Sequence, residues 1–107
     1  MEIGQYSIAL VNLDPTIGSE IQKTRPSLII SPDEMNKHLD TIVLAPMTTN
    51  LKRYPTRVAV DHDGKKVMVM IDQIRTVDKS RVMKVLGMLT KSEIKNCKDI
   101  IKETFVD

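Results

Sequence analysis

Apolar residues occur along this chain in short runs, most of them the length of a β-strand. The first run, residues 5–13, is rich in β-forming residues and ends at Asp14-Pro15, a turn signal. Further strands are expected at 27–30, 41–46, 56–60, 65–71 and 82–89, the last broken by Gly87. Residues 61–64 read Asp-His-Asp-Gly and predict a hairpin turn, because Asp-Gly favours positive φ angles. The pattern therefore predicts a mainly β, mostly antiparallel chain.

The segments between these runs are polar. Residues 16–25 contain Gly18 and end at Pro26, which predicts a long exposed loop, and a loop of this length in a small chain is often functional. Residues 32–36 predict a turn or a single helical turn, and residues 75–78 lead into a bend at 79–81.

A helix is expected to follow the last strand. Thr90 and Glu93 have the spacing of a capping box, in which each side chain accepts from a free N–H group at the start of a helix. Apolar residues then recur at helical spacing and form a stripe that should pack on the sheet: Ile94, Cys97, Ile100, Ile101 and Phe105. Several short strands with one C-terminal helix predict a small SH3-like barrel or half-barrel, with residues 1–107 as one domain.

Composition limits the kinds of core, metal site and cellular location that the chain can have. Aromatic residues make up 3% of the 107 residues, so the core should be aliphatic, and extended aromatic stacking on nucleic acid is disfavoured. The single cysteine excludes an internal disulfide and a multi-cysteine metal site. The sequence shows neither a charged-then-apolar leader nor a long apolar run, so we expect a cytoplasmic protein with no membrane association.

Charge is unevenly distributed along the chain. Residues 52–84 contain nine basic and four acidic residues, a net charge of +5, whereas residues 1–50 carry a net charge of −3. A basic region on a chain whose formal net charge is only +2 can attract phosphate groups. The alternative is that these charges are solvated strand faces and turns.

Common catalytic motifs are missing from the sequence. It has no Gly-rich phosphate loop and no Gly-x-Ser-x-Gly elbow. His38 and His62 lack acidic or cysteine partners at ligand spacing, so neither a metal site nor a cofactor is expected. Cys97 falls on the apolar stripe of the helix, where a structural role is favoured over a nucleophilic one.

The remaining candidates are polar residues in loops or at strand ends: Ser19, Glu20 and Arg25 in the first loop, Thr48 and Thr49 just past the third strand, and Asp72 and Gln73 at the end of the fifth. If these ends converge, they would line a cleft suited to RNA cleavage by a 2′-hydroxyl. Such a cleft needs a base, a cation for the phosphorane, and a donor for the leaving oxygen. Alternatively, Arg25 is a surface charge, Thr48 a strand-end hydroxyl and Asp72-Gln73 a turn anchor.

Three sequence blocks resemble the MazF/PemK toxin family. The first comprises residues 13–20, Thr24-Arg25-Pro26, residues 30–32 and Asn36; the second comprises residues 45–49 with Tyr54-Pro55; the third comprises residues 71–78 with Arg81. They occur in family order and spacing and cover nearly the whole chain. The resemblance implies the SH3-like barrel of the MazF/Kid/CcdB type. It also implies a homodimer whose groove binds single-stranded RNA, and an antitoxin similar to MazE whose disordered tail blocks that groove.

The same resemblance implies a sequence-specific, metal-independent endoribonuclease that leaves a 2′,3′-cyclic phosphate and a 5′-hydroxyl. Arg25 and Thr48 match the family's catalytic arginine and threonine, and Glu20 is the best candidate base. The expected RNA contacts are Ser19, Thr49, Gln73, Lys52 and Arg53.

One branch of the family departs from this pattern. The Kid branch has a His where this chain has Ser19 and an Arg where it has Met70, so its His/Arg/Asp mechanism is not available and Asp72 should be structural. Two other functions remain open: a gyrase poison on the same fold, disfavoured because the chain has no Trp, and an RNA-binding module without activity, disfavoured by the presence of Arg25 and Thr48.

Overall fold

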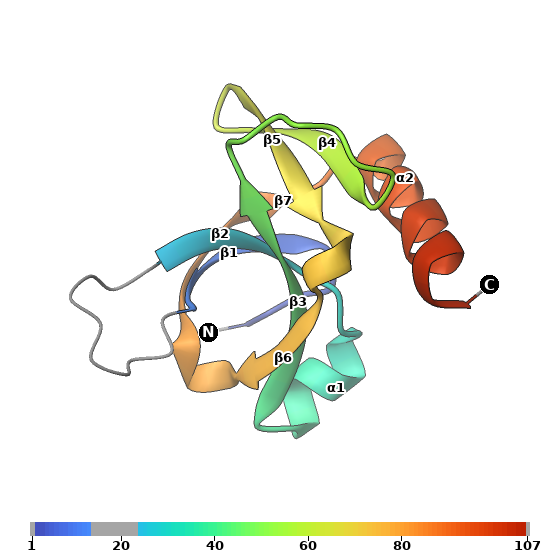
Figure 1. The fold of residues 1–107 in the computed structure, drawn as a ribbon. Coiled ribbons are helices and arrows are strands. Elements are labelled where there is room, and N and C mark those ends of the chain that lie inside the picture. Colours follow the sequence, from blue (N-terminus) through green and yellow to red (C-terminus); the bar gives the residue numbers. More distant parts are fainter. Residues whose placement is uncertain (1, 14–23, 107) are drawn as a thin grey trace, which may run out of the picture.

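A computed structural model describes residues 2–13 and 24–106 (Figure 1). Its strands are β1 (Ser7–Asn12), β2 (Thr24–Ile29), β3 (Thr41–Thr48), β4 (Arg57–His62), β5 (Lys65–Met70), β6 (Arg75–Asp78) and β7 (Val82–Met88). The helices are α1 (Asp33–His38) and α2 (Lys91–Ile101). Short helical turns complete the described elements: η1 (Ile71–Gln73), η2 (Lys79–Arg81) and η3 (Lys102–Val106).

All paired strands are antiparallel, in the order β4-β5-β3-β2-β1-β7, and β6 also pairs with β3. β3 pairs with β6 through its first half, with β2 through its middle and with β5 at its end. Because one strand serves three partners in succession, the sheet curls into a half-barrel, with the β4–β5 hairpin rising beyond it (Figure 1). The predicted class, mainly β with a C-terminal helix, is confirmed.

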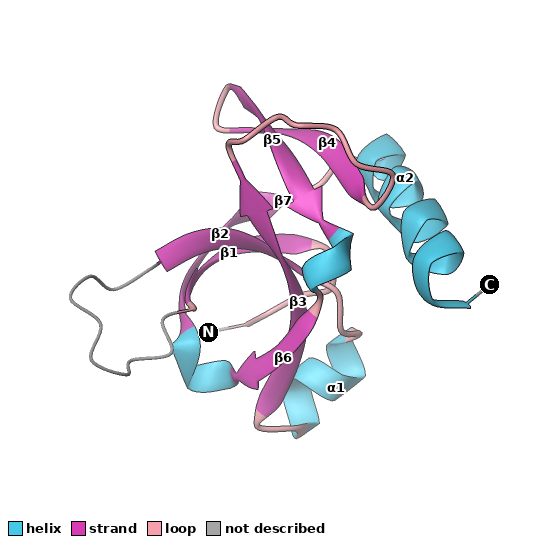
Figure 2. Ribbon diagram, viewed as in Figure 1, coloured by secondary structure: helices cyan, strands magenta, loops and turns pink. Residues whose placement is uncertain are grey.

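The two faces of the curled sheet bury separate apolar clusters. The inner cluster contains Ala9, Val11 and Leu13 with Ile29, Ile42, Leu44, Val77 and Val82. The outer cluster contains Ile8, Leu28, Ala45 and Met47 with residues of β4, β5 and α2. Adjacent residues of one strand belong to different clusters because side chains alternate between the faces of a strand. Figure 2 shows α2 beside β4, where the helix covers the outer cluster.

The expected capping box at the start of α2 is present. The Thr90 hydroxyl accepts from the Glu93 N–H at 3.3 Å, and Glu93 Oε1 accepts from the Thr90 N–H at 2.9 Å. Cys97 is fully buried, as the stripe predicted. The prediction that Phe105 packs on the sheet is wrong: its side chain is 57% exposed, because the α-helix ends at Ile101 and the chain continues as a π-helical turn.

Several predicted boundaries also need correction. The first loop was expected to extend to residue 25, but β2 begins at Thr24, and Arg25 and Pro26 pair with β1. Pro26 is tolerated because this part of β2 does not yet pair with β3, so its missing N–H removes no bond from that ladder. Thr48 is the last residue of β3 rather than a residue past its end.

The last strand is continuous through Gly87, contrary to expectation. Its register with β1 shifts between Ile8 and Ala9 and again between Leu10 and Val11. At these two points β7 contains β-bulges and remains one strand. The β4–β5 turn is as expected, with positive φ at both Asp63 (54°) and Gly64 (75°). Within the described residues, no helix has both the length and the apolar character needed to span a membrane.

Candidate functional site

Strand register places the two main candidate residues on one face of the sheet. Ser27 of β2 pairs with Pro46 of β3. Arg25 lies two residues before Ser27, and Thr48 lies two residues after Pro46. Because the strands are antiparallel, both residues lie toward the same end of this pair. Because the side-chain period of a strand is two, both share the face of Ser27 and Pro46. This convergence depends on the β2–β3 pairing, since the two residues lie far apart in the sequence.

The same face extends onto the projecting hairpin. Thr48 pairs with Met68 of β5, and Met70 of β5 pairs with Arg57 of β4. Val67 and Val69 alternate with the methionines and belong to the outer core cluster. The face that carries Arg25 and Thr48 is therefore continuous with the side of β5 that does not pack under α2.

Arg25 lines a pocket of about 340 Å³ at this end of the half-barrel. Its walls are Leu13, Arg25, Pro46, Met70, Gln73 and Arg75. The described lining thus combines two arginines and one glutamine with three apolar residues, and it contains no Asp or Glu. A guanidinium donates through a planar fork that matches phosphate oxygens, and partial enclosure strengthens this attraction. The pocket is suited to a phosphate group.

The other candidates from the first loop cannot be placed, because Ser19 and Glu20 lie outside the described residues. Gln73 reaches the pocket with Arg25, whereas Thr48 does not belong to its lining. The Thr48 hydroxyl instead accepts from the Asn50 N–H at 3.1 Å, which orders the chain leaving β3. Thr49 is exposed immediately after it.

Lys52 and Arg53 lie in the exposed segment between β3 and β4. The Lys52 ammonium is 5.4 Å from the centre of the Tyr54 ring, and the Lys52 N–H donates to Asn50 Oδ1 at 3.0 Å. Arg53 lines a second pocket, which contains Tyr54 but not Arg25. The predicted site is thus divided between two adjoining parts of one face.

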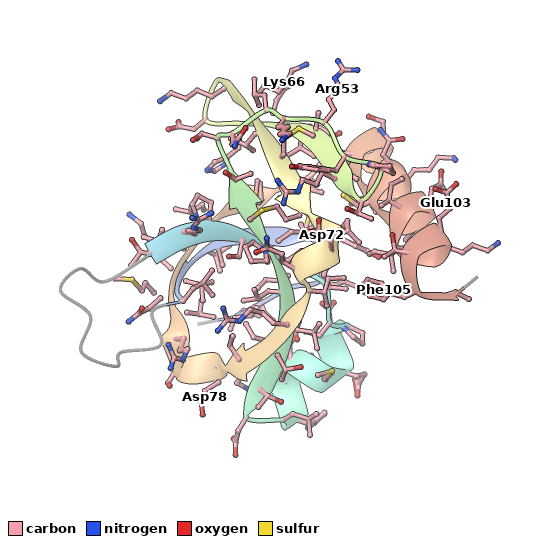
Figure 3. The ribbon with its side chains drawn as sticks, in the orientation of Figure 1. Arg53, Lys66, Asp72, Asp78, Glu103 and Phe105 are labelled. Atoms are coloured by element: carbon pink, nitrogen blue, oxygen red, sulfur yellow. The ribbon has the colours of Figure 1, made fainter. Side chains whose placement is uncertain are left out.

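Asp72 connects the two parts of this face through hydrogen bonds. Asp72, labelled in Figure 3, immediately precedes Gln73. Its Oδ1 accepts from Thr56 Oγ1 at 3.0 Å and from Arg57 Nε at 3.4 Å. Burial raises the pKa of Asp72, but these donors and the Arg57 charge outweigh it and hold the pKa below its ordinary value. The contacts agree with the expected structural role, in which a charged carboxylate anchors the β3–β4 segment to η1.

Two contributors were missed by sequence reasoning. Arg75 enters the Arg25 pocket because β6 pairs with β3 and sets Arg75 opposite Leu44, a pairing that no local pattern reveals. Tyr54 lines the second pocket, and its presence in a sequence block shared with the toxin family was the only available signal.

The remaining reactive groups lie outside this face. Burial raises the pKa of the Cys97 thiol to about 12, with a further contribution from Glu93, so the thiol is protonated at neutral pH. Among residues 2–13 and 24–106, no three His, Cys, Asp or Glu side chains come close enough together to hold a metal ion.

Comparison with known proteins identifies the family. The chain is 34% identical to the endoribonuclease MazF of Staphylococcus epidermidis, in a match that covers 92% of this chain and 89% of the relative. Its fold is similar to MazF of Deinococcus radiodurans (TM-score 0.84, 22% identity, 100% and 99% coverage). It is equally similar to the MazE–MazF structure from that organism (TM-score 0.84, 24% identity, 96% and 95% coverage). Residues 4–105 match the family described as PemK-like, MazF-like toxin of type II toxin-antitoxin system. The chain therefore belongs to the PemK/MazF family of type II toxins.

Proposed function

We propose that this protein is a cytoplasmic toxin that cleaves single-stranded RNA at specific sequences without a metal ion, and thereby inhibits translation and growth. Membership of the family and the endoribonuclease relatives support the nuclease activity. The observation that carries the site is the pocket where Arg25, Arg75 and Gln73 meet, on the face that also carries Thr48.

The proposed reaction is an internal transesterification. The 2′-oxygen attacks phosphorus as its proton passes to a base, the P–O5′ bond breaks, and the 5′-oxygen gains a proton. The products are a 2′,3′-cyclic phosphate and a 5′-hydroxyl. Charge builds up on the phosphorane oxygens, so pre-positioned donors lower the barrier most at that stage.

Each residue has a proposed role in this scheme. Arg25 donates to the phosphorane and assists proton transfer, and Thr48 orients the scissile phosphate by hydrogen bonding. Glu20 is proposed as the base, with Ser19 and Gln73 as RNA contacts. Thr49, Lys52 and Arg53 bind RNA outside the reacting phosphate. The two guanidiniums of the pocket are the main physical support for this scheme.

Two protein partners belong to the proposal. One is an antitoxin similar to MazE, whose disordered tail would order in the RNA groove and block it; solved MazE–MazF structures from D. radiodurans support such a partner. The other is a second copy of the chain.

The edge strand β7 supports this dimer. In the described sheet β7 pairs with β1, and it exposes four large apolar side chains: Met83, Val85, Leu86 and Met88. An unpaired, apolar edge is a liability for a monomer and is usually covered by a partner.

The central test is cleavage of a long single-stranded RNA by purified protein in excess EDTA. We expect cuts at one short sequence whose new 5′ ends accept phosphate from polynucleotide kinase without prior dephosphorylation. Arg25→Ala should lose at least about 100-fold in cleavage rate, as removal of one transition-state donor usually does. Lys95→Ala is the control, because Lys95 pairs with Asp99 on the exposed side of α2 and should leave the rate unchanged.

Three outcomes would contradict the proposal at different levels. Full activity in Arg25→Ala would remove Arg25 from the site. Cleavage that stops in EDTA and returns with a divalent ion would overturn the metal-independent mechanism. Cleavage of a substrate carrying 2′-deoxyribose at the cut position would exclude attack by the 2′-oxygen.

A further inference from the structure

Tyr54 presents an aromatic ring beside the proposed phosphate site. It lies in the segment between β3 and β4, and it is 41% exposed. The Arg57 guanidinium carbon is 4.6 Å from the ring centre. The Arg57 side chain itself is only 15% exposed and donates to Asp72. A guanidinium that is hydrogen-bonded to a carboxylate thus packs on the ring.

The ring forms part of a basic pocket of about 360 Å³. This pocket is lined by Leu51, Arg53, Tyr54, Arg57, Ala59, Lys66 and Met68. Leu51, Ala59 and Met68 provide apolar contacts beside the ring. Arg53 and Lys66, which lie near each other at the hairpin end of the molecule in Figure 3, add positive charge to the lining. No acidic side chain belongs to the described lining.

This pocket directly adjoins the Arg25 pocket. Met68 lines one and Met70 lines the other, two residues apart on the same face of β5. Two residues of a strand span about 7 Å, so the pockets are close enough for one short stretch of RNA to occupy both. Thr48, the proposed phosphate-orienting residue, pairs with Met68 and connects them.

We propose that the Tyr54 pocket binds one unpaired nucleobase next to the cleaved bond, by stacking on the Tyr54 ring. This inference rests on the proposed function. An aromatic ring attracts the face of any base, and the cations around this pocket attract the phosphates that flank it. Stacking fixes where the following phosphate lies, so Tyr54 helps to set which bond reaches Arg25 and Thr48.

The experiment uses the cleaved sequence as a short RNA that carries 2′-deoxyribose at the cut position, which permits binding without cleavage. Abasic nucleotides replace one base at a time, and affinity is measured by fluorescence anisotropy of a dye on the RNA end. For the wild-type protein, one abasic position beside the cut should weaken binding about 10-fold, within the range expected for base–aromatic stacking.

Variants of Tyr54 separate stacking from a structural role. Tyr54→Leu should bind the intact RNA about 10-fold more weakly and lose nothing further at that abasic position. Tyr54→Phe keeps the ring and should retain the wild-type response to the abasic position. In Tyr6→Phe, Tyr54 is the only tyrosine of the chain, so its fluorescence should be quenched by the intact RNA but not by that abasic RNA.

The outcomes distinguish this inference from the function on which it rests. If the wild type cleaves RNA but Tyr54→Leu shows the same loss at every abasic position, the stacking inference is wrong and the nuclease assignment stands. The same holds if Tyr54 fluorescence does not respond to RNA. If the wild type neither binds nor cleaves RNA, the proposed function fails first.

Discussion

Glu93 connects helix α2 to the hairpin behind the candidate site. One carboxylate oxygen accepts from the Thr90 N–H and the other from the Asp61 N–H of β4, both at 2.9 Å. Replacing Glu93 with Ala removes both bonds and leaves two N–H groups without this acceptor. We expect the helix start and the β4–β5 hairpin to loosen together.

The size of the effect follows from these two contacts. Hydrogen bonds to a charged group contribute about 1.5–3 kcal/mol each to stability. Because Glu93 is partly exposed, each of its two hydrogen bonds should contribute no more than the lower limit of this range. The free energy of unfolding should therefore fall by about 2 kcal/mol for Glu93→Ala and by about 1 kcal/mol for Thr90→Ala, which removes a single cap bond. For a domain of this size, 2 kcal/mol lowers Tm by roughly 9 °C.

The pH dependence provides a second test of the same contact. Burial raises the pKa of Glu93, but the bonds from the Asp61 and Thr90 N–H groups and from the Thr90 side chain outweigh it, so the folded-state pKa is below 4.5. This carboxylate therefore stabilises the fold above pH 4.5, and its contribution is lost as the pH falls through the lowered pKa. Glu93→Gln should lose that part of the acid dependence.

The measurements are urea denaturation and thermal unfolding at fixed protein concentration, at pH 7 and at several values below pH 4.5. Glu103→Ala is the matched control, because Glu103 is exposed in the terminal turn η3 and its loss should change stability by less than about 0.5 kcal/mol. Equal stability of Glu93→Ala and Glu103→Ala would refute the argument. So would an acid profile of Glu93→Gln identical to that of the wild type.

Two further predictions concern single positions. Gly64 has φ of +75° with nothing within 4 Å of an added Cβ, so Gly64→Ala should cost about 1 kcal/mol from backbone strain alone, measured by urea denaturation. Gly87→Ala meets open space without positive φ and should be near neutral; an equal loss in both variants would contradict the strain argument. Burial and a pKa of about 12 should keep Cys97 unreactive toward a disulfide reagent at pH 8 until urea unfolds the chain. Rapid reaction of the folded protein would show that α2 opens.

Much of the local structure could be predicted from sequence because it depends on neighbouring residues. The Asp63-Gly64 turn requires positive φ, and Gly supplies it at little cost. The Thr90–Glu93 cap joins groups three residues apart. Helical spacing correctly placed Cys97 in the core, but the sequence pattern did not show where each element ends. Pro26 and Phe105 were misjudged because strand pairing and a π-helical turn override local preference there.

The convergence of the candidate site was decided by the tertiary structure. The family resemblance singled out Arg25 and Thr48 from sequence, yet their common face depends on the β2–β3 register, and Arg75 joins Arg25 through the pairing of β6 with β3. A shift of one residue in either register would turn a side chain to the opposite face. Local sequence specifies dihedral angles and caps over a few residues. The meeting of distant side chains depends instead on how the whole sheet curls to bury its two cores.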